Sequence, residues 1–72
     1  MQKPNFYEFR VEGHLSDGWS DWFEGLAIRN ESNGETIMSG SMADQAALFG
    51  VLGKIQALNL ALVSVRRLSP SG

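Results

Sequence analysis

The sequence contains no cysteine, two prolines and a single histidine among its 72 residues. Without cysteine, neither a disulfide nor a thiolate metal site can form. A chain this short buries only about 60% of the surface that it exposes when unfolded, and such domains commonly need staples, metals or partner subunits. We therefore expect one domain over residues 1–72, with an ordered core at about 6–67 and frayed ends, stabilised by a good single core or by self-association.

Charge is also scarce, at 19% charged residues and a net charge of −2. The six basic residues are scattered, and only Arg66 and Arg67 are adjacent. Because nucleic-acid binding normally needs a clustered basic face, we expect no nucleic-acid partner. No apolar run approaches the roughly 18 residues of a membrane span, and the first residues lack the apolar core of a signal peptide. These absences favour a cytoplasmic protein without membrane contact, and 43% hydrophobic residues favour a globular one.

Three segments before residue 43 are typical of β-strands. Phe6 to Leu15 alternates apolar and polar side chains, which is the pattern of a half-buried strand. A second strand is expected at Leu26–Asn30 and a third at Glu35–Met42. Asn33-Gly34 between them is a strong hairpin signal, because both residue types tolerate positive φ.

A helix and a last strand follow. Apolar residues at helical spacing predict a helix from about Gln45 to Leu58, with Ser41 or Asp44 as its N-cap and Asn59 as a left-handed stop. The strand from Leu60 to about Arg67 is apolar on both faces. The order β-β-β-α-β predicts an α+β fold: a four-stranded mixed sheet with one helix on one face. A right-handed crossover would bring the last strand beside the first and parallel to the first and third, in the spatial order third, second, first, last.

The expected helix carries only one charge, Lys54. On the side away from the core it presents a small-residue stripe of Ala46, Gly50, Gly53 and Ala57, rimmed by Phe49. An exposed helix face normally carries several charges, and each interior glycine costs about 1 kcal/mol relative to alanine. The stripe is either a neutral solvent surface or a groove in which another subunit packs.

Three of the seven aromatic residues, Trp19, Trp22 and Phe23, fall within five positions, in a segment expected to form one helical turn or a wide loop. Such rings serve as core or interface anchors, as walls of a small-molecule pocket, or as a docking site for another protein. The sequence leaves these three alternatives open.

No residue pattern indicates catalysis. His14, Asp17, Asp21 and Glu24 lie close in sequence, but their spacing matches no metal loop, and we interpret them as solvated loop residues. No serine lies in a nucleophile elbow, and the helix glycines do not form a phosphate loop. We therefore expect a protein that is not an enzyme and holds no cofactor or metal.

Several blocks of residues carry a resemblance to a known family. These are Arg10-Val11-x-Gly13-x-Leu15, Trp19-Ser20-x-Trp22-Phe23-x-Gly25-Leu26-x-Ile28, Gly34-x-Thr36, Gly40, Asp44-Gln45-Ala46-Ala47-Leu48-x-Gly50-x-Leu52-x-Lys54-Ile55 and Leu62-x-Ser64-Val65. Across about Tyr7 to Arg66 the chain resembles a family of small uncharacterised bacterial proteins. The resemblance implies a compact bacterial protein and brings no activity, cofactor or catalytic residue with it.

A sheet covered by one helix leaves its other face open, and the last strand is apolar on that side too. We therefore expect a non-enzymatic interaction protein that forms a homo-oligomer, with a dimer favoured, through the helix stripe, the open sheet face or both. The alternative is a small-molecule-binding domain with a pocket walled by Trp19, Trp22 and Phe23.

Overall fold

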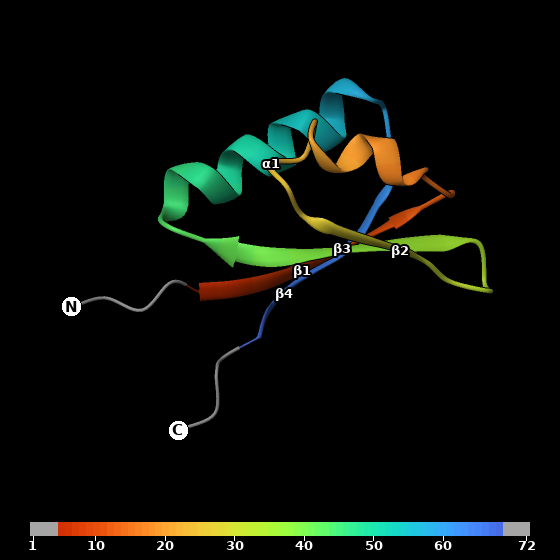
Figure 1. The fold of residues 1–72 in the computed structure, drawn as a ribbon, viewed down its shortest axis with the longest axis horizontal. Helices are drawn as coiled ribbons and strands as arrows, with labels where there is room; N and C mark the ends of the chain where they lie inside the picture. Colours follow the sequence, from red (N-terminus) through yellow and green to blue (C-terminus); the bar gives the residue numbers. More distant parts are fainter. Residues whose placement is uncertain (1–4, 69–72) are drawn as a thin grey trace.

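The computed structural model describes residues 5–68, so the expected fraying of residues 1–4 and 69–72 lies outside the described range. The elements are, in order, β1 (Asn5–Glu12), the 3-10 helix η1 (Asp17–Ser20), β2 (Ala27–Asn30), β3 (Glu35–Met42), α1 (Gln45–Ala57) and β4 (Leu62–Leu68). The fold is α+β: α1 and the helical segment that contains η1 lie on the same side of one sheet (Figure 1). The 3-10 helix η1 lies in the segment where the sequence predicts one helical turn or a wide loop, although the expected order of elements does not include it.

The sheet is antiparallel throughout, with strand order β2-β3-β1-β4, so the prediction of a mixed sheet in another order is wrong. The error comes from the partner assumed for β1, because β1 pairs along its whole length with β3 and not with β2. The segment between β1 and β2 is long enough to carry β2 past β3. Since β1 runs opposite to β3, a strand that returns through α1 parallel to β3 must lie antiparallel to β1.

The core lies between α1 and the sheet. Phe9 and Val11 from β1, Met38 from β3, and Val51 from α1 are completely buried, and Ile55 is nearly so. Leu15, Phe23, Leu26 and Met42 complete the same cluster. Alternate residues of a strand point to the same face of the sheet, and residues four apart lie on the same face of a helix. The buried residues follow these two spacings, so that they form one apolar layer between β1, β3 and α1.

The ends of α1 are determined by local chemistry. Asp44 is the N-cap, and its carboxylate accepts a hydrogen bond from the Ala47 N–H at 2.9 Å. Asn59 adopts a left-handed φ of 58°, and the Leu60 N–H donates to the Ile55 carbonyl, which turns the chain back toward the sheet. Both ends agree with the caps that the sequence predicts.

The face of the sheet opposite α1 is mostly polar. Arg10 donates to the Glu35 carboxylate at 2.9 Å, and Arg66 lies 3.8 Å from that of Glu8. Ile37 is buried on this face between the register positions of Arg10 and Arg29, whose aliphatic stems can cover it.

Both valines of β4 lie on the side of α1, and a register shift brings Leu62 to that side as well. Ser64 pairs with Arg10 but Leu62 pairs with Val11, so Val63 is the extra residue of a β-bulge. The pairing puts Leu62 on the side of α1, and alternation on either side of Ser64 puts Val63 and Val65 there too. The prediction that the last strand is apolar on both faces is therefore wrong.

Candidate functional site

The structure separates the three clustered aromatic residues. Phe23 is completely buried in the core, whereas Trp19 and Trp22 are 38% and 42% exposed. The two indoles meet edge to face, with ring centroids 6.5 Å apart. One aromatic residue therefore anchors the segment from inside, and two present ring surface to the outside.

A compact turn holds this segment in place. The Ser20 hydroxyl donates to the Leu26 carbonyl at 2.7 Å, and the Gly25 N–H donates to the Ser20 carbonyl at 2.8 Å. Glu24 and Gly25 both have positive φ, at 62° and 79°, and the turn depends on a residue such as glycine that adopts this conformation freely.

Lys54, the one charged residue of α1, joins the helix to this segment. Its ammonium forms an ion pair with Glu24 and lies 5.4 Å from the centre of the Trp22 ring. A cation over an indole is attracted by the negative face of the ring, by about 0.5–1 kcal/mol at an exposed site. Lys54 thus marks the flank of α1 that faces η1 and β2.

The small-residue stripe of α1 lies on the surface. Ala46, Gly50, Gly53 and Ala57 are exposed, and Phe49 beside them is 60% exposed. A Cβ added at Gly50 or Gly53 would meet no atom within 4 Å. Nothing within residues 5–68 packs on the stripe.

Exposed apolar side chains that the sequence did not reveal lie along β4, at the sheet edge on the other side of α1 from Lys54. Leu62, Val63 and Val65 are exposed by 45%, 45% and 38%. At 100° per residue, Leu52 projects from α1 on the flank opposite Lys54, and Phe49 lies between that flank and the small-residue stripe. We call this surface, made of Phe49, Leu52, Leu62, Val63 and Val65, the β4 patch. The bulge in β4 brings Leu62 to the side of the two valines, and no simple alternation pattern signals it.

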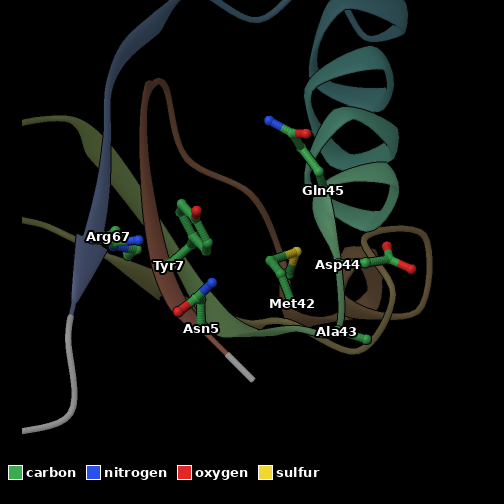
Figure 2. Close-up of a pocket in the computed structure, with 7 residues that line it drawn as sticks. All are labelled: Asn5, Tyr7, Met42, Ala43, Asp44, Gln45 and Arg67. Carbon is green, nitrogen blue, oxygen red and sulfur yellow. The ribbon is translucent and has the colours of Figure 1, made fainter. Parts of the chain in front are cut away.

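A polar cavity of about 550 Å³ opens where α1 begins. Its lining consists of Asn5, Tyr7, Met42, Ala43, Asp44, Gln45 and Arg67. Figure 2 shows Tyr7 and Gln45 between the sheet and the helix, with the Asp44 side chain directed away from them. None of the three clustered aromatic residues lines this cavity. Since β2 and β4 are the two edge strands and Lys54 faces the segment beside β2, the opposite flank of α1 lies toward the β4 edge.

A family model described as a domain of unknown function, DUF8691, matches residues 6–66. The chain belongs to this family. The match covers nearly the whole described fold, and it agrees with the resemblance to uncharacterised proteins. No curated protein and no solved structure matches the chain.

The acidic residues near η1 do not converge in this DUF8691 domain. Within the described residues, no group of three His, Cys, Asp or Glu side chains could hold a metal ion. A ring nitrogen of His14 lies 2.9 Å from the Glu31 carbonyl, in the neighbouring turn. In the DUF8691 domain, the hydrogen bond from Arg10 lowers the pKa of the Glu35 carboxyl. That pair lies on the open sheet face, away from both the β4 patch and the cavity.

No helix in the described part of the DUF8691 domain combines the length and apolar character needed to cross a membrane. Its longest helix, α1, has 13 residues.

Proposed function

We propose that this protein is a non-enzymatic interaction protein that works as a homo-oligomer, in the first instance a dimer. The carrying observation is the β4 patch: large apolar side chains stay exposed along an edge strand and on the helix beside it. Scattered apolar residues on a surface need no explanation, but a contiguous group favours an interface. The stripe of Ala46, Gly50, Gly53 and Ala57 offers a second surface for the same purpose.

Chemistry of the residues supports a binding role over a catalytic one. A catalytic acid, base or nucleophile is usually found where burial or a neighbouring charge shifts its pKa inside a cleft. The perturbed pair of Arg10 and Glu35 forms an ordinary ion pair on the sheet surface. The cytoplasmic location favoured by the sequence stays a prediction.

Light scattering after size exclusion, across a hundredfold range of concentration, tests the proposal. One chain has a mass of 7.9 kDa, and we expect twice that mass at the higher concentrations. A monomer over the whole range would overturn the proposal.

A small-molecule-binding role is the second candidate, and the two exposed indoles favour it. Trp19 and Trp22 form an aromatic surface with the Lys54–Glu24 ion pair at its edge, which suits a flat ligand that stacks on the rings. The core position of Phe23 leaves the two tryptophans to form the wall. A ligand there should quench tryptophan fluorescence and raise the melting temperature as its concentration exceeds the dissociation constant. Trp19→Ala should abolish both effects, and a broad metabolite panel without any shift would count against this role.

A further inference from the structure

We propose that the second copy of the chain binds edge to edge at β4, antiparallel, about a two-fold axis through Val65. This inference rests on the proposed homodimer and names its interface. The two sheets then become one continuous sheet with both α1 helices on the same side, and the β4 patches of the two copies meet across the axis.

The two edges of the sheet differ in what they offer a partner. The edge strand β2 has four residues, Ala27–Asn30, and η1 lies against it. The side chain of Asn30 is engaged by Leu15, whose N–H and carbonyl it bonds at 3.0 and 2.9 Å. In contrast, β4 has seven residues without proline or glycine, and its outer backbone groups have no strand beside them in residues 5–68. A long edge of this kind is a template for strand pairing.

Apolar side chains lie along the same edge. Leu62, Val63 and Val65 stay exposed because α1 lies over the strands that contribute Phe9 and Met38, further into the sheet. A partner strand at β4 would bring its own copies of these side chains against them. The β4 patch then lies at the centre of the joined sheet, on the side of the two helices.

A second copy suits this edge because a strand can always pair antiparallel with itself about a two-fold axis. An axis through Val65 sets Val65 opposite its own counterpart, Ser64 opposite Arg66, and Val63 opposite Arg67. Every pair from residue 63 to residue 67 then joins side chains on the same face of the sheet. No arginine lies opposite an arginine, whereas an axis through Arg66 or Arg67 would set that residue against itself, which is unfavourable.

The area of contact also points to more than the strand. The seven residues of β4 extend over about 23 Å. The surface of a strip of that length and one strand wide is small compared with the roughly 800 Å² per partner that a standard interface buries. The helix residues of the β4 patch, including the 60% exposed Phe49, supply additional apolar surface beside the strip. The interface therefore includes both β4 and the adjacent flank of α1.

The absence of cysteine in the chain allows a clean cross-linking test. Directly opposed residues of antiparallel strands have Cα atoms about 4.5 or 5.5 Å apart, within the range of about 4.4–6.8 Å that a disulfide spans. Val65→Cys should therefore give a disulfide-linked dimer rapidly under mild oxidation. Ser64→Cys is the matched control on the same strand, since two residues of offset separate its two copies. Gly53→Cys tests whether the two copies instead contact each other through the small-residue stripe of α1.

Two further measurements complete the design. Val65→Lys should weaken the dimer about tenfold or more by light scattering, since it sets two ammonium groups opposite each other, with an unchanged circular dichroism spectrum. If the wild-type protein is a dimer but Gly53→Cys or Ser64→Cys forms the disulfide in preference to Val65→Cys, this inference is overturned and the homodimer proposal stands. A wild-type monomer would instead overturn the proposed function itself.

Discussion

Replacing the helix glycines by alanine should stabilise the protein. Gly50 and Gly53 lie inside α1, both are exposed, and a Cβ at either position would meet nothing within 4 Å. The methyl group therefore causes no clash and loses no contact. Glycine costs about 0.8–1.0 kcal/mol relative to alanine in a helix interior, so each substitution should add about 1 kcal/mol. The double variant should gain about 2 kcal/mol if the two positions act independently.

Urea and thermal unfolding, followed by circular dichroism at one fixed protein concentration, measure this gain. In a domain of this size about 1 kcal/mol raises the melting temperature by roughly 4–8 °C. Gly34→Ala is the matched control, because its Cβ would also meet nothing within 4 Å but its φ is +90°. The same methyl group should therefore destabilise the protein at Gly34 through backbone strain.

A neutral or destabilising effect of Gly50→Ala and Gly53→Ala would refute the reasoning. It would mean that the stripe is not free in solution, and that another surface packs on it closely enough to exclude a methyl group. Gly53→Glu would then distinguish the two uses of the stripe: dissociation of a folded protein identifies it as an interface between copies. If the alanine variants are stabilised and the dimer persists, the interface lies elsewhere.

Three other predictions concern stability. Phe23→Ala should cost about 3–5 kcal/mol by denaturant unfolding, because Phe23 is completely buried, whereas Trp22→Ala should cost only about 1 kcal/mol; equal costs would contradict the division of the aromatic cluster. The hydrogen bond from Arg10 lowers the pKa of Glu35. The stability that this hydrogen bond contributes is therefore present above the ordinary carboxyl pKa and is lost as the pH falls through the lowered pKa. Glu35→Gln should flatten the acid limb of the curve of stability against pH, and an unchanged limb would contradict this. Gly40→Ala should cost about 1–3 kcal/mol by the same assay, since its Cβ would lie 2.5 Å from a methyl group of a buried leucine, and a neutral result would show that this leucine moves freely.

Local features of the fold were predictable because nearby residues determine them. Asp44 and Asn59 end α1 through their own hydrogen bonds and backbone conformation, and the β3 segment follows from its pattern. Even so, the turn at Asn33-Gly34 adopts positive φ only at Gly34, while the Asn33 side chain accepts from the Glu35 N–H. The strength of a hairpin signal thus does not specify its turn type.

Strand order was not predictable from neighbours in sequence. The choice of β3 over β2 as partner of β1 depends on contacts far apart in the chain. One is the Thr36 hydroxyl of β3, which lies 2.5 Å from the Gly13 carbonyl and 2.8 Å from the Asn30 side chain. Thr36 is completely buried, so its hydroxyl needs such partners. A single threonine in a strand pattern carries no sign of that role.

The candidate interface also depends on a feature that the sequence pattern does not predict. The sequence draws attention to a helix with a single charge, but the extent of the exposed apolar surface depends on a bulge that brings Leu62 to the side of Val63 and Val65. Without the bulge, Leu62 would lie on the polar open face, and the strand would present a shorter apolar row beside α1. A bulge also bends and twists its strand, which commonly protects an edge from pairing. Here it lies at the start of β4 and leaves residues 64–68 in regular register with β1, so the unprotected part of the edge coincides with Val65. This coincidence of regular backbone and exposed apolar side chains is what makes β4, and not the helix stripe, the stronger candidate for the contact between copies.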